Sequence, residues 1–239
     1  MNEPEPKPKP ATEPHAERIA YRPPPDVGLD VVHADEALVV VNKPAGLLSV
    51  PGRGDDRQDC LALRVQQRFA DALVVHRLDM ATSGLLVMGR GLAMQRALSM
   101  AFEQRLAHKR YEAIVHGLID ADVGEIDLPL MTDWPQRPRQ KVCFAQGKPS
   151  LTRFTVLARD VALQRTRVAL EPVTGRSHQL RVHLLAIGHP IVGDELYAVS
   201  ASGHALRGEP DRMLLHAAEL ALPHPRDGQT VCWHSAVPF

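Results

Sequence analysis

Residues 73–88 have the sequence LVVHRLDMATSGLLVM, in which two apolar runs enclose a polar segment. Apolar runs of this length, rich in Val and Leu, are typical of strands. We therefore expect one strand to lead into the segment 76–84 and another strand to leave it. Two strands that follow each other without an intervening helix argue against a doubly wound parallel sheet.

Outward from this pair, the chain carries further short apolar runs and a few helical patterns. The predicted helices are 60–69, 92–102 and 178–187, the last capped by Ser177 and ended by Gly188 and Pro190. The predicted strands are 37–42, 111–117, 154–157, 166–170, 213–222 and 229–233. This order predicts an α+β fold with a mixed, mainly antiparallel central sheet and flanking helices.

The two ends of the chain differ in composition. Residues 1–27 combine eight prolines with Glu and Lys and cannot bury apolar surface, so we predict a disordered tail there. Residues 28–239 are predicted to form one domain. Within it, residues 130–150 are rich in proline and basic residues, and we expect an irregular insert.

Charge and cysteine content exclude several classes of protein. The 28 basic and 28 acidic residues balance, so any binding to nucleic acid must come from local basic patches. The three cysteines are widely spaced, which suggests neither a disulfide framework nor a zinc ribbon. The chain has no apolar stretch long enough to span a bilayer and no apolar signal region. We therefore expect a cytoplasmic protein without a membrane partner.

Asp79 lies in the polar segment between the two central strands, at a strand end where catalytic groups are often presented. Thr82, Ser83 and Gly84 can fix this loop through local hydrogen bonds and a glycine turn. The alternative is an aspartate that only caps its own turn, and this loop alone favours that alternative.

Three other segments could carry chemistry. Tyr111 enters a strand beside two cations, so it could stack on a base and take part in proton transfer, or simply be a half-buried strand residue. Arg176 precedes a predicted helix N-terminus and could hold a carboxylate or a phosphate, whereas the alternative is a surface arginine. The insert places Trp134 among Arg137, Arg139 and Lys141, a mixture that suits base stacking and phosphate contacts, although charged loops are usually just solvated.

Together these segments resemble the RluA family of pseudouridine synthases from about Gly28 onward. The resemblance rests on HRLD followed by TSG at 76–84, KRY at 109–111 and TGRSHQLR at 174–181. NKPAGL at 42–47 and GHPIVGD at 188–194 match further family landmarks. The resemblance implies the pseudouridine synthase fold without the S4 domain of many relatives, because the segment before Leu29 is too short and too polar for that domain.

The resemblance also implies roles for individual residues. Asp79 is the expected catalytic aspartate, paired with Arg176, and Tyr111 lies against the target base. Leu180 provides an apolar floor, and Arg77 fills the space that the flipped base leaves. The remaining expected substrate-binding residues are His76, Arg137, Arg139 and Lys141.

The insert 133–143 resembles that of the family member acting on both a 23S rRNA hairpin and the tRNA anticodon stem-loop. The implied targets are uridine 746 of 23S rRNA and uridine 32 of tRNA. This isomerisation needs no redox change or external energy, so we expect no cofactor, and the histidine spacing predicts no metal site. Because the sequence has no obvious dimer motif, we expect a monomer. Two competing interpretations are a non-catalytic RNA-binding protein on the same fold and a metal-dependent hydrolase built from the histidines. Within the enzyme interpretation, other rRNA uridines are the alternative target.

Overall fold

The computed structural model describes residues 21–198 and 210–239. The helices are α1 (Leu61–Arg68), α2 (Gly91–Glu103) and α3 (Gln179–Ala186), with two short 3₁₀ turns at Asp55–Arg57 and Trp134–Gln136. The first strands are β1 (Asp30–Ala34), β2 (Leu38–Lys43), β3 (Ala72–Val74), β4 (Ser83–Arg90), β5 (His108–His116) and β6 (Val123–Asp127). They are followed by β7 (Leu130–Thr132), β8 (Gln140–Val142), β9 (Leu151–Asp160), β10 (Arg165–Pro172), β11 (Leu215–Pro223) and β12 (Thr230–His234).

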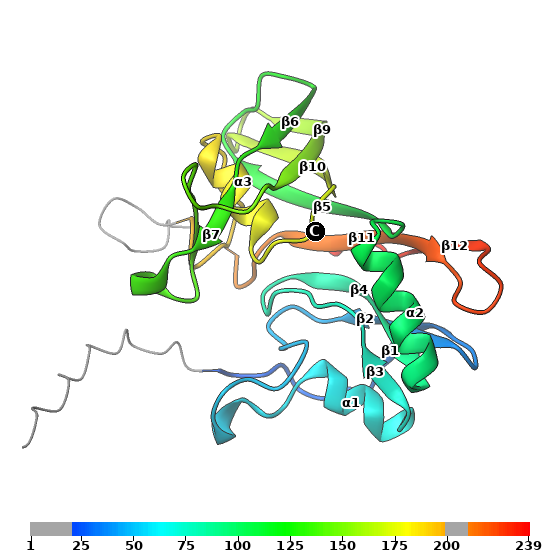
Figure 1. Ribbon diagram of the computed structural model, residues 1–239. Coiled ribbons are helices and arrows are strands. Elements are labelled where there is room, and N and C mark those ends of the chain that lie inside the picture. Colours follow the sequence, from blue (N-terminus) through cyan, green and yellow to red (C-terminus); the bar gives the residue numbers. More distant parts are fainter. Residues whose placement is uncertain (1–20, 199–209) are drawn as a thin grey trace, which may run out of the picture.

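One ten-stranded sheet runs through the molecule in the order β1-β2-β4-β11-β5-β10-β9-β6, with β3 beside β4 and β12 beside β11. All of its pairings are antiparallel except β4 with β11, which is parallel. Strands β1 to β4 with α1 and α2 form one half of the fold, and β5 to β10 with α3 form the other (Figure 1). The predicted α+β class with a mixed, mainly antiparallel sheet is confirmed.

The first half buries both faces of its strands, which explains their continuous apolar runs. Val39 and Val41 of β2 pack with α1 in one core, whereas Leu38 and Val40 pack with Leu98 of α2 in the other. Successive side chains of a strand point to opposite faces, so each strand supplies both cores. In the second half, α3 packs on β5 and β10 through an apolar core of its own.

Strands β4 and β11 approach each other closely where the two halves meet. Ser83 and Gly84 are in register with His216 and Ala217. A Cβ atom added to Gly84 would lie 2.3 Å from the carbonyl oxygen of Ala217, and Gly84 has a φ of +111°. Only glycine fits this position without strain, so the last residue of the TSG run at 82–84 is required by the sheet junction.

Two local expectations need correction. Helix α3 begins at Gln179, and its N-cap is His178 in the left-handed region at φ 52°, with no side-chain cap. The predicted Ser177 cap is wrong because the side chain of Gln179 holds the helix entry instead, accepting the N–H of Arg176 at 3.0 Å. The insert is also more regular than predicted, since β7 and β8 form a two-stranded sheet within it. Strand β6 was not predicted because its polar, partly exposed sequence gives only a weak apolar signal.

The predicted tail at 1–27 remains a prediction for residues 1–20, which lie outside the described residues. Residues 21–27 instead lie along the domain: Tyr21 donates its hydroxyl hydrogen to the carbonyl of Asp59 at 2.9 Å, and Arg64 donates to the carbonyl of Pro24 at 2.7 Å. No helix among the described residues is long and apolar enough to cross a bilayer.

Candidate active site

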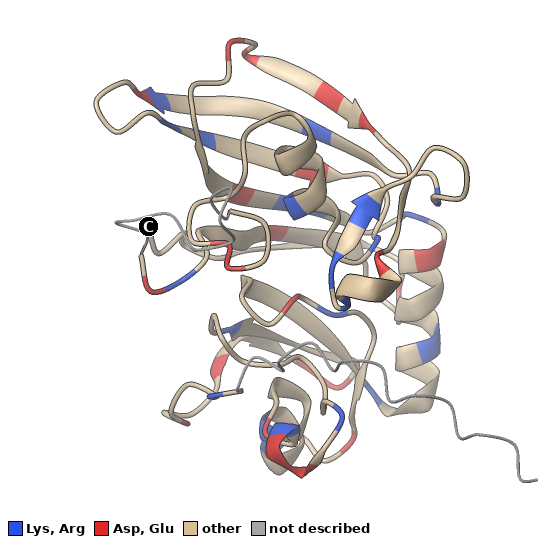
Figure 2. Ribbon diagram, turned by 90° about the vertical axis from the view of Figure 1, so that its left-hand side faces the viewer, with Lys and Arg blue, Asp and Glu red and all other residues tan. Residues whose placement is uncertain are grey.

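A cleft opens between the two halves of the fold, and Asp79 lies in it. The described residues that line this cleft include twelve Lys or Arg and seven Asp or Glu. Over the whole ribbon both signs of charge are interspersed (Figure 2), in keeping with a net charge of zero. The excess of cations is therefore local to the cleft, which suits a polyanionic ligand in a protein without overall basic charge.

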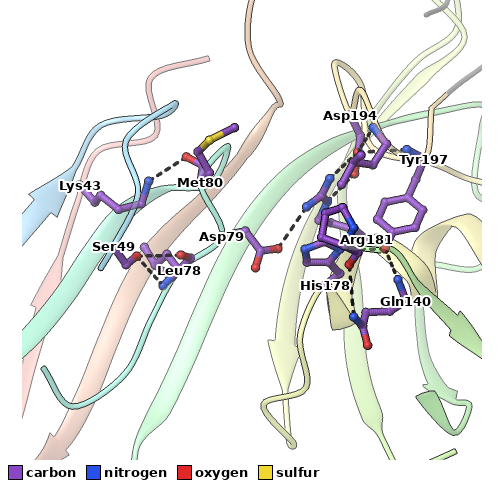
Figure 3. A network of polar contacts seen from close by, with 12 residues as sticks. Lys43, Ser49, Leu78, Asp79, Met80, Gln140, His178, Arg181, Asp194 and Tyr197 are labelled. Atoms are coloured by element: carbon purple, nitrogen blue, oxygen red, sulfur yellow. Dashed lines mark hydrogen bonds and ion pairs between the residues drawn. The ribbon is translucent and has the colours of Figure 1, made fainter. Parts of the chain in front are cut away.

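The backbone beside Asp79 is held on both sides by one segment that precedes it in the chain. The hydroxyl of Ser49 donates to the carbonyl of Leu78 at 2.7 Å and accepts the Leu78 N–H at 3.1 Å. The ammonium group of Lys43 donates to the carbonyl of Met80 at 2.9 Å. The position of Asp79 is thus fixed by its two neighbours in sequence (Figure 3).

Lys43 is an almost fully buried cation, with 1% of its surface exposed. Besides Met80, its ammonium group donates to the carbonyls of Leu47 at 2.7 Å and Pro44 at 2.9 Å, so three carbonyls match its three hydrogens. Burial lowers the pKa of Lys43 to about 7, and the nearby charge of Asp79 opposes this shift. The NKPAGL run at 42–47 therefore serves as the anchor of the Asp79 loop.

On the other side of the cleft, Arg181 reaches toward Asp79. Its Nη1 lies 3.3 Å from Asp79 Oδ2, while Nε and Nη2 each donate at 2.7 Å to the two carboxylate oxygens of Asp194. Asp194 is fully buried, and Arg181 is 5% exposed. The bidentate pair fixes the guanidinium plane, so Asp79 meets a donor whose direction is set before any substrate binds (Figure 3).

Arg176 does not form the predicted pair with Asp79. Its guanidinium is exposed and its Nε lies 3.4 Å from the carbonyl of Pro149. The reason is the left-handed His178, after which α3 begins and points Arg181 into the cleft instead. Arg176 still lines the cleft, where an exposed guanidinium can contact a phosphate.

Tyr111 and Leu180 line the cleft beside the Asp79–Arg181 pair. The Tyr111 ring packs against the cores of both halves, and Leu180 is 7% exposed on α3. Burial raises the pKa of Tyr111 well above its usual value, as does the charge of Asp79. The Tyr111 hydroxyl therefore stays a neutral phenol, suited to packing and hydrogen bonding rather than to accepting a proton as a phenolate.

The other predicted substrate-binding residues fall into different settings. Arg77 is exposed in the cleft, and the guanidinium of Arg137 lies 4.5 Å from the centre of the exposed Trp134 ring. Lys141 forms an ion pair with Asp133 at 3.1 Å and is not among the cleft-lining residues. Arg139 also lines the cleft but is engaged within the fold, donating to the carbonyl of Leu196.

His76 has a structural setting. Its Nε2 accepts the backbone N–H of Val87 at 3.1 Å, and its ring stacks on Phe102 with centroids 4.5 Å apart. Burial lowers its pKa to about 3. His76 is partly exposed and lines the cleft, and because its acceptor nitrogen is used by the backbone, it supports the loop from the cleft wall.

Four residues of this arrangement were not assigned a role from the sequence: Lys43, Asp194, Tyr197 and, as the partner of Asp79, Arg181. The signals that could have found them are the runs NKPAGL and VGDELY, in which a charged residue stands in an otherwise apolar setting. A charge that must be buried needs a partner, but the sequence does not say which one.

Among the described residues, a potential metal-binding group lies on β11 and β12, where Glu219 also lines the cleft. Ligand atoms of Glu219, Cys232 and His234 lie within 4.8 Å of one another on β11 and β12. These residues belong neither to the Asp79 loop nor to α3, so the carboxylate and guanidinium groups described above do not depend on this cluster.

A family model described as RNA pseudouridylate synthase matches residues 37–186, which include the Asp79 loop, Tyr111 and α3. A dual-specificity RNA pseudouridine synthase RluA from Vibrio cholerae is 50% identical over 206 residues, which cover 86% of this chain and 82% of that protein. The chain belongs to the RluA family of RNA pseudouridine synthases.

Further members of the RluA family match over nearly their whole length. The protein of the same description from Haemophilus influenzae is 46% identical, with 92% of this chain and 99% of that protein covered. The one from Escherichia coli K12 is 45% identical, with 92% and 98% covered. The chain is accordingly an RNA pseudouridine synthase, an enzyme whose substrate is RNA.

Solved structures agree with the RluA-family fold. Human RNA pseudouridylate synthase domain containing 1 superimposes with a TM-score of 0.73 at 32% identity, covering 90% of this chain and 86% of that one. Human RNA pseudouridylate synthase domain containing 4 gives a TM-score of 0.68 at 24% identity, with 87% and 88% covered. The second likeness concerns the fold alone.

A buried polar network lies directly after the Asp79 loop of this RluA-family enzyme. The hydroxyl of Ser83 accepts from Arg212 at 2.6 Å and lies 2.8 Å from Nδ1 of His216. On the other side, Nε2 of His216 lies 2.9 Å from the hydroxyl of Ser235, which donates to Asn42 at 2.7 Å. Because the Ser235 hydrogen goes to Asn42, His216 donates through Nε2 and accepts through Nδ1, which requires the neutral imidazole.

We predict that mild acid destabilises the protein. Burial lowers the pKa of His76 to about 3 and of His216 to about 4, and it lowers the pKa of His178 and His183 as well. Between pH 6.5 and these values the unfolded chain binds protons that the folded chain does not, so stability falls as pH falls. At pH 5 the loss should be about 2 kcal/mol for His76 and similar for His216.

Urea unfolding at neutral pH and at pH 5 measures this effect. His76→Gln keeps an acceptor for the Val87 N–H without a group that titrates in this range, and it should remove about 2 kcal/mol of the pH dependence. His108→Gln, at an exposed histidine, is the matched control. An unfolding free energy in the His76 variant with the same pH dependence as the wild type would contradict the prediction.

Proposed function

We propose that the protein isomerises uridine 746 in a 23S rRNA hairpin and uridine 32 in the tRNA anticodon stem-loop. The relatives that are 45–50% identical carry the description dual-specificity, and the insert 133–143 of this chain resembles that of the family member with this specificity. The observation that carries the chemistry is the ion pair of Asp79 with a buried, preset Arg181 in a cation-rich cleft.

Asp79 acts on the ribose in this proposal. The N1–C1′ bond of uridine breaks, the ring turns, and C5 bonds to C1′. C5 then loses its proton and N1 gains one, so the product is an isomer of the substrate. A carboxylate beside the sugar can add to C1′, stabilise an electron-poor ribose, or remove the 2′ proton. Glycosidases commonly use a second carboxyl group as acid, but Asp194 is buried and bonded through both oxygens to Arg181. Of the two carboxylates that Arg181 contacts, only Asp79 is open to the cleft, and one such carboxylate can suffice for a leaving uracil that remains in the pocket.

The neighbours of Asp79 hold the base. The neutral phenol of Tyr111 packs on the uracil and can donate a hydrogen bond to it. Leu180 of α3 offers the base an apolar surface in the same cleft. A uridine in a structured RNA must leave its stack to enter such a pocket, which costs a few kcal/mol. Arg77 is exposed and two residues from Asp79, so its planar guanidinium can fill the vacated space.

The insert supplies a recognition surface. The Trp134 side chain is 63% exposed, and the guanidinium of Arg137 stacks on it, which presents a π-face and a cation side by side. Unpaired bases of an RNA loop stack on aromatic rings and on arginine planes. We propose that the monomer is the active form.

Mapping pseudouridines in total RNA from cells with and without this protein tests the assignment. We expect modification to disappear at the two proposed uridines and to return when the wild-type protein is supplied again. Loss at other rRNA uridines alone would replace the proposed targets, and no loss at any position would favour a non-catalytic RNA-binding role.

A further inference from the structure

Tyr197 links the insert to the catalytic ion pair. It is 6% exposed and follows Asp194, whose Oδ1 accepts the N–H groups of Leu196 at 3.0 Å and Tyr197 at 3.2 Å. The carboxylate that holds Arg181 therefore also fixes the backbone from which the Tyr197 ring projects.

The ring and the hydroxyl of Tyr197 face different partners. The guanidinium of Arg181 lies 5.0 Å from the ring centre and that of Arg139, from the insert, lies 5.8 Å from it. The hydroxyl accepts the backbone N–H of Gln140, the first residue of β8, at 2.8 Å. It also lies 2.8 Å from Nδ1 of His178, a neutral imidazole that can accept the hydroxyl hydrogen (Figure 3).

These contacts connect the insert, which is proposed to bind the RNA, with the Asp79–Arg181 pair, which is proposed to act on the target uridine. The insert sheet β7–β8 carries Trp134 and Arg137 at its far end, whereas Arg181 orients the carboxylate of Asp79. Arg139 of the insert and Arg181 of the active site share one aromatic ring, and the N–H at the start of β8 is bound by the hydroxyl of that same ring. A displacement of the insert would have to break the Tyr197–Gln140 bond.

We propose that Tyr197 is a positioning residue whose hydroxyl sets the place of the RNA-binding insert relative to Asp79. The ring, independently, supports Arg181 by a cation–π contact. This inference rests on the proposed role of the insert in binding RNA. The hydroxyl serves substrate binding and the ring serves the chemical step, so the two can be separated by substitution.

Tyr197→Phe removes the hydroxyl and keeps the ring. With a synthetic anticodon stem-loop tritiated at uridine C5, we expect the KM to rise about fivefold, as one lost hydrogen bond predicts, with kcat within about twofold. Tyr197→Leu, which also removes the ring, should lower kcat about tenfold further. Tyr21→Phe is the matched control, since its hydroxyl also accepts a backbone N–H, that of Leu48 at 3.1 Å, and its KM should stay within about twofold.

A double-mutant cycle with Trp134→Ala tests whether Tyr197 acts through the insert. If it does, Tyr197→Phe should raise the KM no further once the Trp134 contact is gone, because both changes act on one interaction. KM increases that multiply in the double variant, or a Tyr197→Phe enzyme with unchanged KM, would overturn the proposal.

Amide hydrogen exchange gives a second readout that does not depend on turnover. The Gln140 amide should exchange faster in Tyr197→Phe than in the wild type and in Tyr21→Phe, with the change confined to residues 130–142. Unaltered protection of Gln140 overturns the inference even if the stem-loop is not a substrate. A wild-type enzyme without activity on the stem-loop, with faster exchange in the variant, overturns the proposed target and leaves the role of Tyr197 supported.

Discussion

Asp79→Asn is expected to abolish pseudouridine formation while leaving RNA binding within a few-fold of the wild type. The amide has the shape of the carboxylate, and its oxygen can still accept from Arg181, so the loop held by Lys43 and Ser49 should not move. What is lost is the negative charge and the nucleophilic oxygen. Removing a group of this kind lowers kcat by at least about 10⁴-fold.

Tritium release from C5-labelled RNA measures the turnover of Asp79→Asn, and filter binding measures its affinity. Asp122→Asn is the matched control: this exposed acid pairs with Arg159 at 2.7 Å and is not among the cleft-lining residues, so its turnover should stay close to the wild type. Turnover by the Asp79 variant within tenfold of the wild type would show that the chemistry belongs to another group.

Arg181→Lys is expected to reduce kcat about 10²- to 10³-fold, whereas Arg176→Lys should change it by less than about threefold. Arg181 donates through three nitrogens to Asp79 and Asp194 at once, and a single ammonium group cannot reproduce that fork. Asp194 is fully buried and would keep only part of its bonding. The free energy of unfolding should therefore fall as well, by about 2–3 kcal/mol.

Single-turnover kinetics and urea unfolding of the two lysine variants decide between the two arginines. The change is chemically identical in both, and Arg176 has only a weak contact with the Pro149 carbonyl. A kcat loss for Arg176→Lys as large as that for Arg181→Lys would contradict the prediction. It would mean that Arg176, as the family resemblance implied, is the functional partner of Asp79.

Much of the fold could be predicted because its signals are local. The Val- and Leu-rich runs predicted β2, β4 and β11 within a few residues. Gly188 was predicted to end α3 because glycine readily adopts a positive φ, and the chain has a positive φ there. Strand β6 and the small sheet β7–β8 escaped prediction, since short, half-exposed strands leave little apolar periodicity.

The pairing within the site could not be predicted, because it depends on elements far apart in the sequence. Asp79 and Arg181 are 102 positions apart, and the choice between Arg176 and Arg181 depends on a backbone reversal at His178 that no local pattern announces. The role of Lys43 was hidden for a related reason. Its value as an anchor comes from three carbonyls that converge only after the Asp79 loop has folded over residues 43–49.

The central position of β11 has a consequence for synthesis of the enzyme. β11 is encoded near the end of the chain, yet it is the neighbour of both β4 and β5. At roughly 5–20 residues per second, the roughly 125 residues between β4 and β11 take on the order of ten seconds to translate. During that time the start of β4, at Ser83 and Gly84, lacks the strand with which it pairs, and an exposed strand edge of this kind invites mispairing. The cleft is thus completed last, because residues of β11 line it, and we expect a chain that stops before Leu215 to be inactive and prone to aggregation.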